Sequence, residues 1–258
     1  MSANFELIAF YSNPKTLDEL LKAGIDGIII DWENKGKLNR QSLYNTQVNE
    51  HTISDLEFAS KKNVPNLICR INGPSYWSTE EIDKAIDLGA NELLIPMIKK
   101  VEEVAFVLNY VRDRVKVGVM LETSESLAIA DQLNALPIHR FFVGLNDLSI
   151  QRKSRNLFQP FIDGTIETLR PKITKPFGIA GLTHPMGGVP IPCTHLIGQM
   201  KRFDASFGFL RRAFYKDLAT YTAADIIKAL RESFDHNTMV STTKITEEEK
   251  IFFSQELI

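Results

Sequence analysis

The sequence predicts a single (β/α)₈ barrel with a C-terminal extension, and three observations lead to this fold class. The chain has 258 residues, close to the roughly 250 residues typical of such barrels. Short apolar segments rich in Ile, Val and Phe alternate with longer segments of helical period, as parallel strands alternate with covering helices. No Pro-, Gly- or Ser-rich linker divides the chain, so we expect the units to close into one domain.

The apolar segments give the expected strands in chain order. They cover residues 7–11, 27–31, 66–71, 92–96, 117–122, 140–145, 177–182 and 205–210. Start and stop signals frame the helices between them. Pro14 suits a first helical turn and Gly24 a helix end. Ser78 and Glu81 have the spacing of a capping box, which predicts another helix start.

Composition excludes several classes of protein. The formal net charge is -2, with no long block of like charge, so we expect no binding to nucleic acid or to a membrane surface. Cys69 and Cys193 are the only cysteines, too few for a disulfide scaffold or a cysteine-based zinc site. No apolar segment approaches the roughly 20 residues that span a bilayer. We therefore expect a cytoplasmic protein that acts on a small molecule.

The last residues lie beyond the eight expected units. We expect residues 1–238 to form the barrel catalytic domain and residues 239–258 to form a C-terminal arm. Ile251, Phe252, Phe253 and Leu257 are apolar and need burial. We expect the arm to pack on the barrel or on a neighbouring subunit, and we predict a homo-oligomer. The alternative is a frayed tail.

Polar residues follow the expected strands at the ends where such barrels carry their active sites, because the loops after the strands share one rim. These residues are Asp31, Glu33, Arg70, Glu122, Asp147, His184 and Arg211.

Glu122 and Asp147 follow neighbouring strands and are candidate metal ligands. They are 25 residues apart, 147 minus 122, which is about one βα unit. Two carboxylates placed together repel unless a cation lies between them, and hard oxygen ligands suit Mg²⁺ or Mn²⁺. The alternative is that each acid only caps a helix.

Four motifs in this order resemble the HpcH/HpaI aldolase and citrate lyase family. They are R-I-N-G-P at 70–74, L-G-A-N-E-L-L-I-P-M-I at 88–98, V-G-V-M-L-E-T at 117–123 and F-V-G-L-N-D-L-S at 142–149. The resemblance implies a metal-dependent barrel in which Glu122 and Asp147 bind the metal and Arg70 contacts the keto or enolate oxygen of a pyruvate-like unit. Family members often assemble as trimers or hexamers.

The expected role of Arg70 agrees with elementary electrostatics. A cation and a guanidinium aimed at a carbonyl oxygen stabilise the negative charge of an enolate. The alternative is a structural clamp on a neighbouring carboxylate. We also assign Gly144 and Asn146 to substrate binding, while Trp32 either lines the substrate pocket or seals the rim.

The segment D-W-E-N-K at 31–35 departs from the family, because Asn34 stands where the pyruvate aldolase branch usually has a proton-transferring His. Glu33 remains a catalytic candidate beside it. His184, in G-L-T-H-P after the seventh strand, is the candidate replacement base, since imidazole exchanges protons near neutral pH. The alternative is a hydrogen-bonded loop histidine.

The sequence therefore predicts a metal-dependent carbon-carbon lyase or aldolase that acts on a 2-oxo or 3-hydroxy acid. A Schiff-base aldolase needs a lysine on a strand pointing into the barrel, and none is well placed. An acyl-CoA lyase of the citrate lyase beta-subunit or malyl-CoA lyase type is one alternative. A noncatalytic barrel that binds metal and ligand is the other, because such sites survive the loss of a proton-transfer group.

Overall fold

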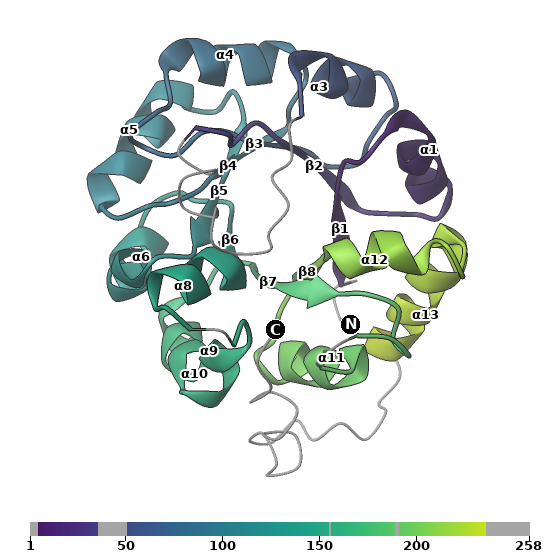
Figure 1. Cartoon of the computed structure of the whole chain (residues 1–258). Coiled ribbons are helices and arrows are strands. Elements are labelled where there is room, and N and C mark those ends of the chain that lie inside the picture. The colour runs from purple at the N-terminus through teal and green to yellow at the C-terminus, as the bar shows by residue number, and fades with distance from the viewer. Residues whose placement is uncertain (1–4, 36–50, 155, 189–190, 236–258) are drawn as a thin grey trace.

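Eight parallel strands hydrogen-bond in chain order, and β8 pairs with β1, so the sheet closes into a barrel (Figure 1). The computed structural model describes residues 5–35, 51–154, 156–188 and 191–235. The predicted (β/α)₈ barrel is confirmed. The strands are β1 Glu6–Phe10, β2 Gly27–Asp31, β3 Leu67–Arg70, β4 Glu92–Ile95, β5 Lys116–Leu121, β6 Arg140–Val143, β7 Phe177–Leu182 and β8 Phe207–Leu210.

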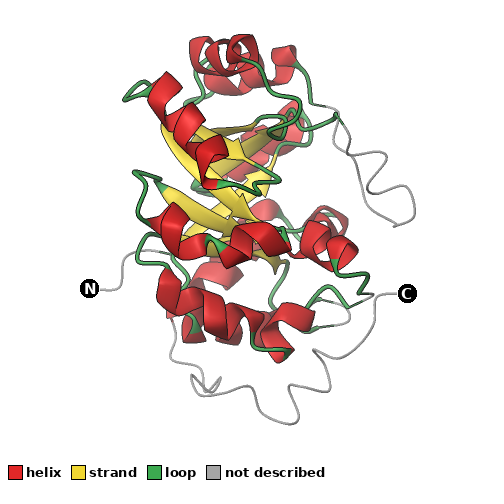
Figure 2. Ribbon diagram, turned by 90° about the vertical axis from the view of Figure 1, so that its left-hand side faces the viewer, coloured by secondary structure: helices red, strands yellow, loops and turns green. Residues whose placement is uncertain are grey.

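Helices surround the strands on the outside of the barrel (Figure 2). The last of them, α13, packs against α1 and α11 and so closes the outer ring. The helices are α1 Pro14–Lys22, α3 Ile53–Ser60, α4 Thr79–Asp87, α5 Val101–Val111, α6 Ser124–Ala128, α7 Ala130–Asn134, α8 Leu145–Gln151, α9 Gln159–Ile162, α10 Thr165–Leu169, the 3₁₀ helix η1 Arg170–Lys172, α11 Cys193–Arg202, α12 Arg212–Asp217 and α13 Ala223–Asp235.

The predicted helix signals act as expected, with one informative difference. Pro14 occupies the first turn of α1, and Gly24 adopts a positive φ of 81° after the helix. The Ser78 side chain accepts a hydrogen bond from the Glu81 N–H at the start of α4. The reciprocal half of the capping box is missing, because the Glu81 carboxylate instead accepts two hydrogen bonds from Asn72.

Side chains alternate between two apolar layers because successive residues of a strand point to opposite faces. The larger cluster lies between strands and helices. The smaller cluster fills the barrel and consists of Ile8, Ile29, Ile68, Leu94, Met120, Phe142, Phe207 and Phe209. A side chain two residues further along a strand points to the same face. Asp31, Arg70 and Glu122 each come two residues after one of these interior residues, namely Ile29, Ile68 and Met120, so they lie above the barrel interior.

A buried charge cluster fills the opposite, amino-terminal end of the barrel. Arg140 donates to both carboxylate oxygens of Glu92, at 3.1 and 2.9 Å, and to Glu6 at 2.7 Å. Its guanidinium also lies over the rings of Phe142 and Phe207. Glu92 is fully buried, and burial raises its pKa although Arg140 opposes the shift. The fully buried carboxylate at this end therefore has a counter-ion, which favours a structural role for the pair.

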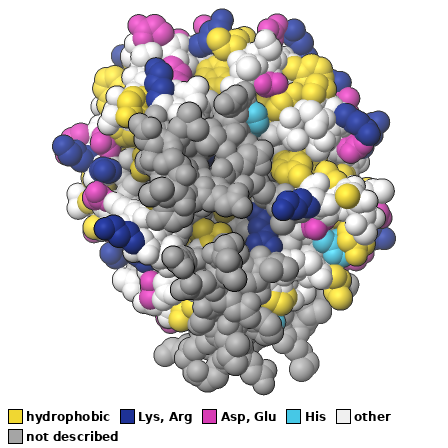
Figure 3. Space-filling model, viewed as in Figure 1, with side chains coloured by type: hydrophobic (Ala, Val, Ile, Leu, Met, Phe, Trp, Pro, Cys, Tyr) yellow, Lys and Arg dark blue, Asp and Glu magenta, His cyan; other side chains and the backbone are white. Residues whose placement is uncertain are grey.

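The described surface shows charges of both signs. On the face in Figure 3, lysine and arginine side chains are interspersed with aspartate and glutamate side chains. The described ranges contain no helix that is long and apolar enough to cross a membrane. The predicted C-terminal arm, 239–258, with Ile251, Phe252, Phe253 and Leu257, lies outside the described residues.

We predict that Arg140→Leu lowers the free energy of unfolding by about 3 to 5 kcal/mol, because it leaves the Glu92 carboxylate buried without its ion pair. Urea denaturation measures the change. Glu6→Gln is the matched control, since Glu6 is about half exposed and its loss should cost less than about 1 kcal/mol. The double variant Glu92→Leu/Arg140→Leu should recover much of the loss. A double variant as unstable as Arg140→Leu would contradict this account.

We also predict an acid-sensitive contribution from His139. Its pKa is lowered from 6.5 to about 4, first by burial and then by the charges of Arg140 and Lys116. As pH falls from 6.5 towards 4, the unfolded chain therefore binds a proton before the folded chain does, and stability is lost. The melting temperature of His139→Gln should fall less than that of the wild type over this window. Parallel pH profiles for the two proteins would refute the assignment.

Candidate active site

Five ionisable side chains meet at the carboxyl end of the barrel, and all are buried. Asp31 and Arg70 end β2 and β3, while Glu122 immediately follows β5. Glu33 lies in the loop after β2, and Asp147 lies in the first turn of α8. Electrostatic interactions join Arg70 to Asp31, Glu33 and Glu122, and join Glu122 to Asp147 and Glu33. The structure thus brings together five residues that the sequence placed on one rim. They are called the carboxylate cluster below.

Arg70 is held by a bidentate ion pair with Asp31. Its Nε lies 2.8 Å from Asp31 Oδ1, and its Nη2 lies 2.6 Å from Asp31 Oδ2. The two residues are register partners on adjacent strands, which explains the close fit. Burial alone would lower the pKa of Arg70, but the charges of Asp31 and Glu33 outweigh it and raise that pKa. The expected clamp on a neighbouring carboxylate is therefore present.

The same clamp orients the third guanidinium nitrogen towards the rest of the site. Nη1 lies 3.5 Å from Glu33 Oε2 and 3.5 Å from the sulfur of Met120. The Phe10 ring lies under the guanidinium, 5.2 Å from its carbon. Arg70 is therefore fixed structurally while one nitrogen faces the interior of the cluster.

Glu122 is fixed by its backbone surroundings. Its Oε1 accepts a hydrogen bond from the Met97 N–H at 2.9 Å. Met97 adopts φ 57°, an uncommon conformation for a residue with a side chain. Burial, then the charge of Asp147 and then that of Glu33 raise the pKa of Glu122 to about 8, against the opposing effect of Arg70. This carboxylate therefore stands in a strongly anionic site.

The helix-cap alternatives can be judged separately. Thr123, rather than Glu122, caps α6 by accepting from the Ser126 N–H, so Glu122 has no capping role there. Asp147 does lie in the first turn of α8, where a carboxylate favours the helix dipole. Gly144 occupies the N-cap position of that helix. The position of Asp147 is thus compatible with both expected roles.

Gly144 provides space for the Glu122 side chain. A Cβ at this position would lie 2.5 Å from Glu122 Oε2 and 2.8 Å from Glu122 Cβ. Asn146, the other predicted substrate residue from this motif, is half-buried, and its carbonyl accepts a hydrogen bond from Ser149. The structure therefore gives Gly144 a spacing role next to the candidate metal ligand.

Asn72 organises the loop that carries Glu33, and sequence reasoning missed it. Its Oδ1 accepts hydrogen bonds from the N–H groups of Asn34 and Lys35 at 3.2 and 3.0 Å. Its Nδ2 donates to Glu81 at 2.6 Å. Asn72 belongs to the R-I-N-G-P motif, which was the available signal. The hydrogen bond of Asn34 uses its backbone N–H, so it depends on the loop geometry and not on the Asn34 side chain.

His184 lies among different partners. Its Nδ1 accepts from the Met186 N–H, its backbone N–H donates to Asp217, and its ring stacks on Tyr221 at 4.1 Å. None of these contacts involves the carboxylate cluster. Because Nδ1 accepts a hydrogen bond, the neutral ring carries its proton on Nε2. The contacts match the loop-histidine alternative stated for this residue.

The Trp32 side chain points to the opposite face of the sheet from that of Asp31. It packs in the outer apolar cluster with Ile28 and Ile30, and its indole N–H donates to the Thr52 carbonyl at 3.1 Å. Alternation along the strand forces this orientation, because Asp31 already faces the interior. Of the two roles expected for Trp32, this packing matches the sealing of the rim.

The donor chemistry of the cluster fits a hard divalent cation. No group of three or more His, Cys, Asp or Glu side chains arranged to hold a metal is found among the described residues. Mg²⁺, however, commonly uses one or two carboxylates and takes its remaining ligands from water and substrate. Glu122 and Asp147 form such a pair, and their repulsion is the kind that a cation relieves.

The chain shares its fold with solved structures of low sequence identity. An HpcH/HpaI aldolase from Desulfitobacterium hafniense DCB-2 has a TM-score of 0.63 at 13% identity, covering 89% of this chain and 94% of that chain. A citrate lyase from Burkholderia xenovorans LB400 has a TM-score of 0.64 at 13% identity, covering 89% and 76%. The citrate synthase SbnG has a TM-score of 0.59 at 17% identity, covering 84% and 91%.

These likenesses agree with the sequence motifs at the level of fold. The aldolase and citrate lyase names are those of the family that the motifs resemble. No protein-family model and no curated protein sequence matches the chain. The comparisons thus show a shared barrel, while the chemistry has to be argued from the site.

We predict that Gly144→Ala destabilises the protein by about 1 to 3 kcal/mol, because the added methyl group overlaps the Glu122 side chain. Urea denaturation gives the cost. The cost should be smaller in a Glu122→Ala background, where the clashing carboxylate is absent but Cβ remains. The explanation fails if Gly144→Ala unfolds at the wild-type urea concentration, or if the background makes no difference.

Proposed function

We propose that this chain belongs to the HpcH/HpaI aldolase and citrate lyase family and is a carbon-carbon lyase or aldolase dependent on Mg²⁺ or Mn²⁺. Its substrate is a 2-oxo or 3-hydroxy acid that yields or consumes a pyruvate-like enolate. The observation that carries the proposal is an imbalance of charge. Among the described residues of the carboxylate cluster, four buried carboxylates, those of Asp31, Glu33, Glu122 and Asp147, accompany one guanidinium, that of Arg70.

An excess of buried negative charge is costly unless a cation balances it. Asp31 is already neutralised by Arg70 through two short hydrogen bonds. Glu122 and Asp147 are the pair that would hold the divalent ion. When bound, the ion would supply electrostatic polarisation of the substrate oxygens. Glu122 is oriented for this by the Met97 N–H, which occupies Oε1, and by the space at Gly144 next to Oε2.

Arg70 binds and orients the substrate oxygen in this proposal. The ion pair with Asp31 uses Nε and Nη2, so Nη1 is the nitrogen that donates towards the reacting carbonyl. A fixed donor requires little reorganisation when negative charge develops on that oxygen. Asp31 thereby acts as a positioning residue. Lys116, the lysine at the start of β5, is exposed at the opposite end of the barrel, which is consistent with a mechanism without a Schiff base.

Glu33 is the proposed proton-transfer residue. It is buried, and its Oε2 faces Arg70 Nη1, so a proton released or taken up next to the enolate oxygen can be held there. His184 is the weaker candidate, because its described contacts are with Met186, Asp217 and Tyr221. Asn72 keeps Glu33 in place by binding the next two backbone N–H groups.

We predict that the protein catalyses exchange of the pyruvate methyl protons with D₂O only when Mg²⁺ or Mn²⁺ is present, measured by proton NMR. Glu122→Gln and Asp147→Asn should lower the exchange rate by at least about 100-fold, the order of loss seen when transition-state electrostatics is removed. Glu125→Gln is the matched control, since this half-exposed acid pairs with Lys99 in the loop before α5. Its exchange rate should stay near that of the wild type.

Exchange that survives complete chelation would contradict the metal-dependent mechanism. Calorimetric titration with oxalate, which mimics the paired oxygens of pyruvate enolate, tests binding separately. Saturable acetyl-CoA binding without oxalate binding would favour the acyl-CoA lyase alternative. Tight binding of Mn²⁺ and oxalate with no exchange or cleavage would instead favour a noncatalytic barrel.

A further inference from the structure

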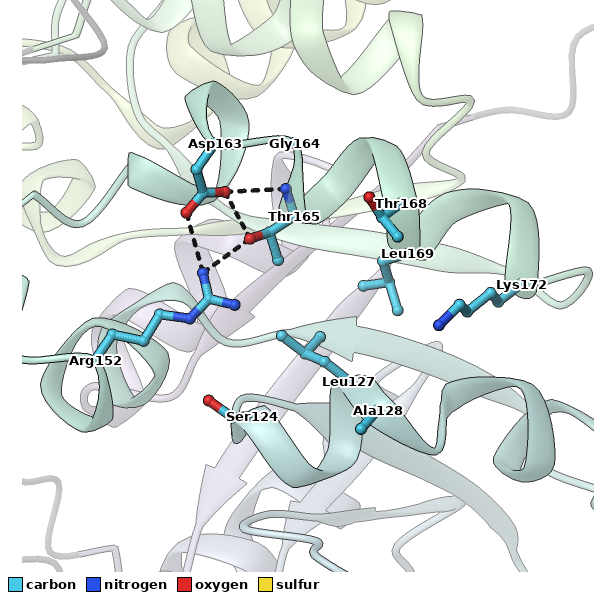
Figure 4. A pocket seen from close by; sticks show the side chains of 10 residues that line it. All are labelled: Ser124, Leu127, Ala128, Arg152, Asp163, Gly164, Thr165, Thr168, Leu169 and Lys172. Carbon is cyan, nitrogen blue, oxygen red and sulfur yellow. Dashed lines mark hydrogen bonds and ion pairs between the residues drawn. The ribbon is translucent and has the colours of Figure 1, made fainter.

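An open groove lies on the outside of the barrel, away from the carboxylate cluster. Its volume is about 350 Å³, within the range of roughly 300 to 1,000 Å³ that small-molecule sites occupy. Leu127 and Ala128 of α6 form one wall, and Leu169 of α10 lies opposite (Figure 4). The middle of the groove is therefore apolar.

Cationic side chains stand at the two ends of this apolar middle. Arg152 lies at one end, where its Nη1 donates to Asp163 at 3.2 Å and to Thr165 at 2.8 Å. Lys172 lies at the other end, and its ammonium group points into the groove (Figure 4). No ion pair with Lys172 is found among the described residues. Two cations and one carboxylate leave the lining with a net charge of +1.

We propose that this groove binds a small aliphatic carboxylate. The anion lies against the Lys172 ammonium, and the hydrocarbon chain lies between Leu127 and Leu169. A single net positive charge complements a monoanion. The apolar walls select a molecule with a hydrocarbon body over a bare inorganic anion, because burial of that body adds to the binding free energy.

The groove also adjoins α6, which begins just after Glu122, and the end of α8, which contains Asp147. Ser124, on its rim, begins α6 two residues after Glu122. Arg152 is the C-cap residue of α8, the helix whose first turn contains Asp147. The Ser124 N–H donates to the Gln151 side chain at 2.6 Å, which joins the two helices. A ligand that contacts both walls is therefore expected to stiffen the support of Glu122 and Asp147 and to raise the affinity for Mn²⁺. This coupling rests on the proposed metal site, whereas binding in the groove does not.

The test is a titration of the metal-free full-length chain with butanoate, pentanoate and hexanoate, followed by carbon-13 methyl NMR. Saturable shifts are expected at the methyl groups of Leu127, Ala128 and Leu169, with affinity rising along the series. Lys172→Met should weaken hexanoate binding by about tenfold or more, the value of one charge-assisted hydrogen bond. Lys175→Met, a nearby lysine outside the groove, should bind hexanoate as the wild type does.

Three results would overturn the assignment. They are the absence of saturable shifts at these methyl groups, equal hexanoate affinity in Lys172→Met and wild type, and binding of inorganic phosphate as tight as that of hexanoate. Hexanamide supplies the neutral control and should bind more weakly than hexanoate. The coupling is measured separately by titrating Mn²⁺ with and without saturating hexanoate. Groove binding with an unchanged Mn²⁺ affinity would refute the coupling and leave the site itself standing.

Discussion

A closed barrel of parallel strands forces side chains to alternate between the interior and the helix layer, and the candidate site depends on this constraint. Ile29, Ile68 and Met120 pack inside the barrel. Two residues further on, the same phase brings Asp31, Arg70 and Glu122 to one mouth. A shift of one residue in any of these strands would move its candidate site residue into the helix layer. Trp32, one residue after Asp31, shows the result, since it packs outside.

The two ends of the barrel differ in how their buried carboxylates are paired with cations. At the amino-terminal end, Arg140 pairs with the buried Glu92, and its second partner, Glu6, is half exposed to water, so the one fully buried carboxylate has a counter-ion. In the carboxylate cluster, the described residues include four buried carboxylates and one guanidinium, and burial with the charges of Asp147 and Glu33 raises the pKa of Glu122 to about 8. A buried carboxylate that is paired with a cation needs no further partner, whereas an excess of buried carboxylates is costly unless a cation joins them. That contrast is why we place the proposed active site at the carboxyl end.

The backbone on both sides of the Glu122 carboxylate restricts its position. Met97 adopts a left-handed backbone conformation, and its N–H binds one oxygen of Glu122. Gly144 lies so close to the other oxygen that a single added carbon would overlap it. Strain and close approach of this kind persist only where the surrounding structure enforces them. Together they hold the carboxylate of Glu122 in one orientation.

Local pattern explains most of the fold. All eight strands occur where the apolar segments predicted them, although β5 and β6 end before Glu122 and Gly144, since these residues lead into helices. Strand periodicity, with the rule that parallel strands end at one rim, also brought Asp31, Glu33, Arg70, Glu122 and Asp147 together. These features depend on neighbours along the chain, and a single sequence records them.

What the sequence by itself determined was therefore the barrel and the set of acids and the arginine at its mouth. Only the tertiary structure decided which carboxylate Arg70 pairs with. Its partner Asp31 is 39 residues away in the sequence and becomes adjacent through strand register. The tertiary structure also decided that Asn72 holds the loop of Glu33, and that His184 binds Met186, Asp217 and Tyr221. Contacts of this kind depend on side-chain direction after the barrel closes, and no spacing along the chain encodes that direction.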